Sequence, residues 1–157
     1  MATNWITVPG IVTQGYGVAS GSGSARFPGG TIRAQLPHFR TRGVDLSPYY
    51  PGTLNVDIAP LRFILVRPSH TMTDVSWWPD APAETFSFSP CRIILPTGSI
   101  DGLIYYPHPE TKPEHPQPPT VIEILAPFLE GVGPGTAVEL QLDSSEVEVR
   151  REGDRRD

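Results

Sequence analysis

The chain has 157 residues, of which 19 are Pro and 15 are Gly. Prolines at this density interrupt helices, because each one removes a backbone donor and clashes with the preceding turn, so the composition excludes a helical bundle. A hydrophobic fraction of 38% with only 18% charged residues excludes a disordered chain, and the net charge of −5 argues against a general binder of the nucleic-acid backbone.

Short β-rich segments between turn residues predict a mainly β fold, with a single domain over residues 1–149 and a charged tail over 150–157. Helices are predicted only over 38–46 and, as a single turn, over 126–131. Long loops are predicted over 68–82 and 107–119. This spacing is typical of a barrel or a sandwich. The predicted strands are 5–8, 11–18, 31–36, 53–58, 62–66, 86–94, 100–106, 121–125, 137–142 and 147–150.

Cysteine usage and hydrophobic runs indicate the compartment. Cys91 is the only cysteine, so no internal disulfide can form, and we expect it to pack as a small hydrophobic residue rather than to act as a nucleophile. Residues 1–6 lack the basic start and apolar run of a signal peptide, and the apolar run 63–66 is too short to span a membrane. We therefore expect a cytoplasmic protein without membrane or nucleic-acid partners; the sequence leaves its oligomeric state open.

Residues 51–58, Pro-Gly-Thr-Leu-Asn-Val-Asp-Ile, form the most informative segment. Pro-Gly predicts a turn, and a strand follows it. The period of two along a strand places Thr53, Asn55 and Asp57 on one face. A hydroxyl, an amide carbonyl and a carboxylate are oxygen ligands that suit Mg²⁺. The same pattern also fits the polar outer face of a half-exposed strand.

A glycine-rich stretch over residues 10–30 and an isolated acid are two further candidates. Glycines let backbone amides approach a phosphate closely, but the stretch taken alone favours a flexible hairpin loop over a phosphate site. Glu123 lies in an otherwise apolar strand, so it either has a partner or ligand or points to solvent from an edge. The four histidines are scattered and no nucleophile-elbow motif is present, so neither a zinc site nor a hydrolase triad is predicted.

Three segments, in this order, resemble the archaeal-type CTP-dependent riboflavin kinase family. They are residues 10–19 (Gly-Ile-Val-Thr-Gln-Gly-Tyr-Gly-Val-Ala), 46–56 (Leu-Ser-Pro-Tyr-Tyr-Pro-Gly-Thr-Leu-Asn-Val) and 122–127 (Ile-Glu-Ile-Leu-Ala-Pro), the last followed by 133–140. Residues 86–94 also resemble the central strand of the family. The resemblance extends over about residues 10–142, and its most specific part is the Pro-Gly-Thr-Leu-Asn run.

The resemblance implies a small six-stranded cradle-loop β-barrel with long loops and at most one or two short helices. It implies transfer of the γ-phosphate of CTP to the 5′-hydroxyl of riboflavin, which yields FMN and CDP. By this resemblance Thr53 and Asn55 hold Mg²⁺, and Thr111 and Glu123 contact the flavin. The nucleotide would lie against Gly15, Gly17, Ala19, Gly21, Gly23 and Arg26.

Asp57 is our own addition, because the strand period alone places it beside Thr53 and Asn55, as a third metal-facing oxygen or as the base for the hydroxyl. The chain departs from the family after Ala126-Pro127, where a Leu-Arg element usually follows and Phe128-Leu129 stands here. Because of this departure, ATP remains an alternative to CTP as the phosphate donor. It also keeps open a non-catalytic relative that binds flavin or nucleotide on the same barrel, and an unrelated function on that fold.

Overall fold

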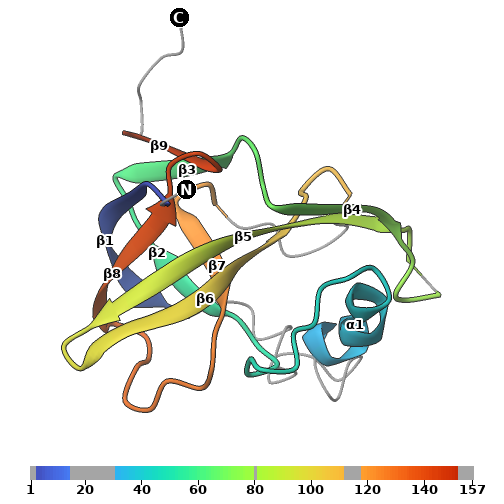
Figure 1. The fold of residues 1–157 in the computed structure, drawn as a ribbon, viewed down its shortest axis with the longest axis horizontal. Coiled ribbons are helices and arrows are strands. Elements are labelled where there is room, and N and C mark those ends of the chain that lie inside the picture. The colour runs from blue at the N-terminus through green and yellow to red at the C-terminus, as the bar shows by residue number, and fades with distance from the viewer. Residues whose placement is uncertain (1–2, 15–30, 80, 112–117, 152–157) are drawn as a thin grey trace, which may run out of the picture.

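The computed structural model describes residues 3–14, 31–79, 81–111 and 118–151. Within these ranges the chain forms nine strands and one helix, so the predicted mainly β class is confirmed (Figure 1). In chain order the elements are β1 (Trp5–Thr13), α1 (Thr31–Arg40), β2 (Leu54–Asp57), β3 (Leu61–Leu65), β4 (His70–Val75), β5 (Glu84–Leu95), β6 (Gly98–Pro107), β7 (Val121–Leu125), β8 (Ala137–Asp143) and β9 (Val147–Arg151).

Six antiparallel strands close into a ring in the order β5-β6-β7-β2-β1-β8, because β8 pairs with β5 as well as with β1. Apolar side chains fill the inside of this ring, among them Val56, Ile93, Ile104, Ile122, Ile124 and Leu140. Strands β3 and β9 form a separate two-stranded sheet whose Phe63 and Val147 pack on the same core. Since β3 follows the Asp57 end of β2, this sheet covers the end of the ring away from Thr53 (Figure 1).

Strand β1 is continuous, so the turn predicted between residues 8 and 11 is wrong. Pro9 and Gly10 pair with Glu139 and Val138 of β8, while β2 pairs with β1 only from Ile11 onward. A proline is tolerated where its strand needs no donor on that edge. Glycine at position 10 allows β1 to approach Val56 closely, because a Cβ there would lie 2.4 Å from Cγ1 of Val56.

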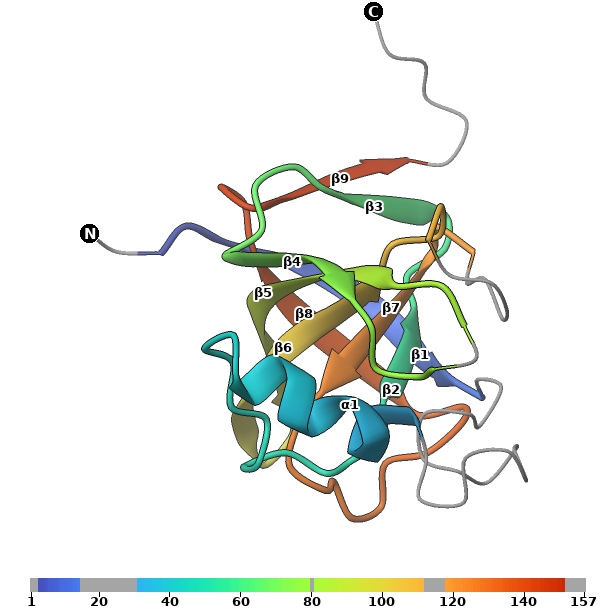
Figure 2. The same ribbon diagram turned by 90° about the vertical axis from the view of Figure 1, so that its right-hand side faces the viewer.

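The only helix of the described residues is α1. It occupies residues 31–36, which were predicted as a strand. The helix predicted over 38–46 is correct only as far as Arg40, where α1 ends. Ile32, Gln35 and Phe39 are buried at helical spacing and pack the helix against the outer face of β5 and β6 (Figure 2). The polar Gln35 on this face and Pro37 inside the helix concealed the period in the sequence. Gly43 follows the helix with φ +97°, a conformation that favours glycine at a helix end.

Three smaller differences complete the comparison. β4 lies inside the loop predicted over 68–82; a register shift between Met72 and Val75 breaks its alternation, which hid the strand. The helical turn predicted over 126–131 is absent, and these residues form a loop. β9 runs to Arg151, two residues beyond the boundary placed at 149.

No helix in the described part of the chain has the length and apolar character needed to cross a membrane.

Candidate functional site

Three side-chain oxygens converge on the outer face of the ring, at the Thr53 end of β2. The Thr53 hydroxyl lies 3.0 Å from Oδ1 of Asn55 and 3.4 Å from Oε1 of Glu123. Asn55 is directly opposite Glu123 in the β2–β7 register. A hydroxyl carries one proton, so Thr53 can fully satisfy only one of these two acceptors at a time. The predicted shared face of Thr53 and Asn55 is confirmed, and Glu123 has a partner in Thr53.

The register of the ring extends this group into a row across neighbouring strands. Asn55 pairs with Thr13 on one side and with Glu123 on the other, and residues directly opposite each other point to the same face. Their strand neighbours Val56 and Ile122 face the interior core, so the row faces outward. Thr13 ends β1, and the glycine-rich stretch follows it in the sequence. The predicted nucleotide-binding residues of that stretch (Gly15, Gly17, Ala19, Gly21, Gly23 and Arg26) lie outside the described residues.

Tyr105 of β6 lies close enough to Glu123 to feel its charge, and it also contacts α1. Burial raises the pKa of its hydroxyl well above the usual value, and the negative charges of Glu123 and Glu84 raise it further. The hydroxyl therefore stays protonated, and it donates to Oε1 of Gln35 at 2.7 Å. Glu84 is itself buried and accepts a hydrogen bond from the Trp77 indole at 2.8 Å. Tyr105 can thus support the site and anchor α1, but it cannot act as a base.

The donor set of Thr53, Asn55 and Glu123 fits a magnesium ion. A hydroxyl, an amide carbonyl and a carboxylate are hard oxygen ligands, and Mg²⁺ commonly takes one or two protein oxygens and completes its shell with phosphate and water. The described residues contain no cluster of three or more His, Cys, Asp or Glu side chains that could hold a metal. An ion at this site would therefore depend on the oxygens of Thr53 and Asn55, with the Glu123 carboxylate nearby, and on a bound phosphate.

Asp57, the proposed base or third metal ligand, lies two residues further along β2, opposite Val121. Its Oδ1 accepts a hydrogen bond from the backbone amide of Ala59 at 2.9 Å. One oxygen of this carboxylate therefore stabilises the connection between β2 and β3. A spacing of two residues along a strand separates Asp57 from Asn55 by about 7 Å.

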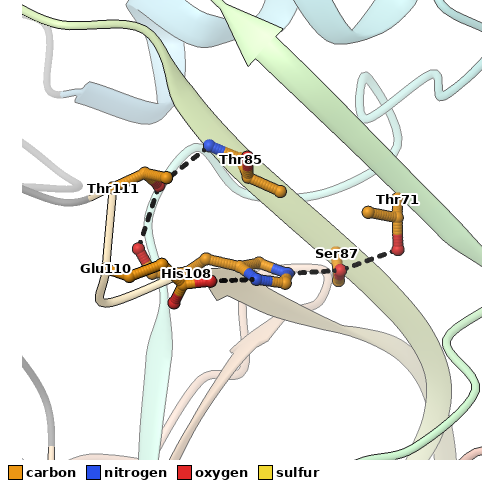
Figure 3. A network of polar contacts seen from close by, with 6 residues as sticks. All are labelled: Thr71, Thr85, Ser87, His108, Glu110 and Thr111. Carbon is orange, nitrogen blue, oxygen red and sulfur yellow. Dashed lines mark hydrogen bonds and ion pairs between the residues drawn. The ribbon is translucent and has the colours of Figure 1, made fainter.

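Thr111, the other predicted flavin contact, belongs to a different network at the end of β6 (Figure 3). Its hydroxyl donates to the carbonyl of His108 at 3.0 Å and accepts from the amide of Thr85 at 2.9 Å. The hydroxyl of Thr111 therefore both donates and accepts a hydrogen bond, and it ties the turn that follows β6 to the start of β5. The structure thus groups Glu123 with Thr53 and Asn55, and groups Thr111 with His108.

His108 is the centre of a polar chain that the sequence did not predict (Figure 3). Its Nε2 lies 2.7 Å from Oγ of Ser87 and its Nδ1 lies 3.2 Å from the carboxylate of Glu110, while Thr71 contacts Ser87 at 2.9 Å. The order serine, histidine, carboxylate is that of a hydrolase triad. However, Ser87 is fully buried, so no substrate can reach its hydroxyl. The chain joins β4, β5 and the end of β6, and no sequence motif links residues so far apart.

Cys91 is equally unsuited to nucleophilic chemistry, as predicted. It lies inside the ring, opposite Leu142 of β8, with 2% of its surface exposed. Burial, and to a smaller extent the charge of Asp101, raises the pKa of its thiol to about 12. The thiolate is the reactive form of cysteine, so this side chain is a packing residue.

Two loops flank the Thr53 end of β2, one before β2 and one between β7 and β8. The amide of Tyr50 donates to the carbonyl of Ala126 at 2.9 Å, which joins the segment before β2 to the segment after β7. The amide of Gly135 donates to the carbonyl of Val12, and Val12 donates in turn to Thr136. The same loops bring the rings of Tyr50 and Phe128 together. The sequence signal for this pair is weak: each ring adjoins a proline.

Comparison with known proteins assigns no family to the chain. No protein-family model matches the chain, and no curated protein matches it. The chemistry of the site is therefore interpreted from its own residues and from the three segments that carry the resemblance.

Proposed function

We propose that the chain is a riboflavin kinase-like phosphotransferase built on a cradle-loop β-barrel. It would move the γ-phosphate of a nucleotide, CTP by resemblance, to the 5′-hydroxyl of riboflavin with the help of Mg²⁺. The observation that carries this proposal is the contact of the Thr53 hydroxyl with both Asn55 and Glu123, whose strands are far apart in the chain. The resemblance assigns the first two residues to the metal and the third to the flavin. A closed ring of six strands agrees with the expected fold.

The protein's part in such a reaction is mainly to position groups and to compensate charge. A bound Mg²⁺ would neutralise charge on the phosphates. Asn55 on β2 and Thr53 directly before it would hold this ion. The pairing of β2 with β1 and β7 fixes Asn55, and Thr53 is hydrogen-bonded to Asn55. The Glu123 carboxylate would accept a hydrogen bond from a hydroxyl of the flavin side chain and so orient it. The oxygen of Asp57 that does not bond Ala59 would be the atom that takes the hydroxyl proton.

A second candidate is a non-catalytic relative that binds flavin or nucleotide at the same place. Two observations favour it. One oxygen of Asp57, the proposed base, bonds the backbone of Ala59. In addition, Phe128 stands where the family usually has its Leu-Arg element, and 70% of its surface is exposed.

The deciding experiment measures FMN formation from riboflavin with Mg²⁺ and either CTP or ATP. We expect product that requires Mg²⁺, and we expect the double variant Thr53→Ala, Asn55→Ala to lose it. Thr97→Ala, at an exposed position in the β5–β6 turn, is the matched control and should keep full activity. Melting temperatures of the three proteins verify that they are folded.

The two candidates give different outcomes. Quenching of riboflavin fluorescence without product, for both nucleotides, would replace the kinase by the binding protein. If neither product nor quenching is seen, and neither CTP nor ATP raises the melting temperature, both candidates are refuted. If the double variant keeps its Mg²⁺ dependence, the assignment of Thr53 and Asn55 to the metal is wrong even when the activity exists.

A further inference from the structure

Two exposed aromatic rings lie on the segments that precede β2 and follow β7. The ring centroids of Tyr50 and Phe128 are 5.4 Å apart with an interplanar angle of 57°. Tyr50 is 46% exposed and Phe128 is 70% exposed. Much of each side chain is therefore accessible, whereas Phe39, Phe86 and Phe88 are fully buried in the core beneath α1. An exposed pair of large rings is unfavourable in water, so this pair requires an explanation.

The backbone holds both rings in a defined position. Tyr50 precedes Pro51 and Phe128 follows Pro127, and proline restricts its own φ as well as the residue before it. The hydrogen bond from the Tyr50 amide to Ala126 ties the two segments together. Rings that are fixed before a ligand arrives lose little entropy when it binds.

The pair is close in sequence to the oxygen site. Tyr50 is three residues before Thr53, and Phe128 is five residues after Glu123. Three residues of extended chain span at most roughly 11 Å. A ligand that places phosphate or hydroxyl groups at Thr53, Asn55 and Glu123 can therefore reach the pair with a ring at its other end.

We propose that Tyr50 and Phe128 form a stacking platform for the planar heteroaromatic ring of the ligand bound at Thr53, Asn55 and Glu123. Because the two side chains are inclined at 57°, the ligand ring would stack on the face of one of them and meet the other edge to face. The inference rests on the proposed function, since both the nucleotide and the flavin carry such a ring. Stacking uses the face of a ring rather than its hydrogen-bonding edge, so it tolerates every base. If the bound ring is the nucleobase, the protein accepts ATP as well as CTP. The platform then takes the place of base recognition by an Arg in the segment after Pro127.

The test measures dissociation constants of Mg-CTP, Mg-ATP, riboflavin and the ring-less probe Mg-tripolyphosphate. The variants are Tyr50→Ala and Phe128→Ala, and Val66→Ala is the control because Val66 is a similarly exposed apolar residue outside these loops. Loss of one stacking contact weakens binding roughly 5- to 100-fold. We expect this loss for at least one class of ring ligand in both variants, with tripolyphosphate binding unchanged.

The ligands in this test distinguish a bound nucleobase from a bound flavin. Weaker binding of both nucleotides identifies the nucleobase, and weaker binding of riboflavin identifies the flavin; either result supports the platform. Unchanged affinity for all ring ligands overturns it, and so does an equal loss for tripolyphosphate. A platform result without FMN formation would refute the kinase alone, whereas FMN formation with wild-type kinetics in Phe128→Ala would refute the platform alone.

Discussion

Gly10→Ala tests the packing between β1 and β2 that places Thr13 beside Asn55. An added Cβ would lie 2.4 Å from Cγ1 of Val56 and 3.3 Å from the carbonyl of Asp57. Val56 is fully buried in the interior core and cannot turn away, so the strands must separate by about 1 Å to reach ordinary contact. Overpacking of this kind costs about 1–3 kcal/mol of unfolding free energy. For a chain of this size we expect the melting temperature to fall by roughly 2–12 °C.

Gly133→Ala is the matched control. Nothing lies within 4 Å of a Cβ at Gly133, so the same substitution there should change the unfolding free energy by no more than about 0.5 kcal/mol. Both variants are unfolded by heat and by urea under identical conditions. The Gly10 variant should also bind Mg-nucleotide more weakly, because Thr13 and Asn55 would move apart. Identical melting of the Gly10 variant and the wild type would show that β1 and β2 are not packed as described.

Two further predictions concern buried groups. The pKa of Cys91 rises from 9.0 to about 12 on folding, so this thiol stabilises the fold fully below pH 9, and that contribution is lost as the pH rises toward 12. Between pH 8 and pH 11 the unfolding free energy of the wild type should fall by about 3 kcal/mol more than that of Cys91→Ala; parallel curves in urea denaturation would contradict this. Ser87→Ala removes the hydroxyl shared by His108 and Thr71 and should cost about 1–3 kcal/mol in the same denaturation assay, because His108 Nε2 loses its partner. A loss below about 0.5 kcal/mol would indicate that water replaces the serine without penalty.

The strand that carries Thr53 and Asn55 was predictable because its information is local. Alternation along residues 53–58 is enough to place these two side chains together, and the structure has them in hydrogen-bonding contact. Glu123 also stood out in the sequence, since it is an acid in an apolar strand. Its contact with Thr53 was not predictable, because it follows from the pairing of β2 with β7 across a separation of 70 residues.

Other features could not be found because tertiary contacts override local patterns. Residues 31–36, predicted as a strand, belong to α1, and the polar Gln35 on its buried face has a hydrogen-bond partner in Tyr105 that the local sequence does not reveal. In β4, the alternation of buried and exposed side chains is broken by a shift in the register of its pairing with β5. Ser87 and His108 meet because β5 pairs with β6, and neither residue is unusual in its own segment.

The position of the site follows from how completely the ring is filled. Val56, Ile104 and Ile122 have no exposed surface, so the interior is a packed core and offers no space to a ligand. Alternation along β2 and β7 then leaves only the outer face for polar side chains, and the cross-strand register brings Thr13, Asn55 and Glu123 into one row there. Substitutions of Thr53 or Glu123 therefore leave the core untouched. A loss of binding in such variants, with an unchanged melting temperature, would report on the chemistry of the row itself.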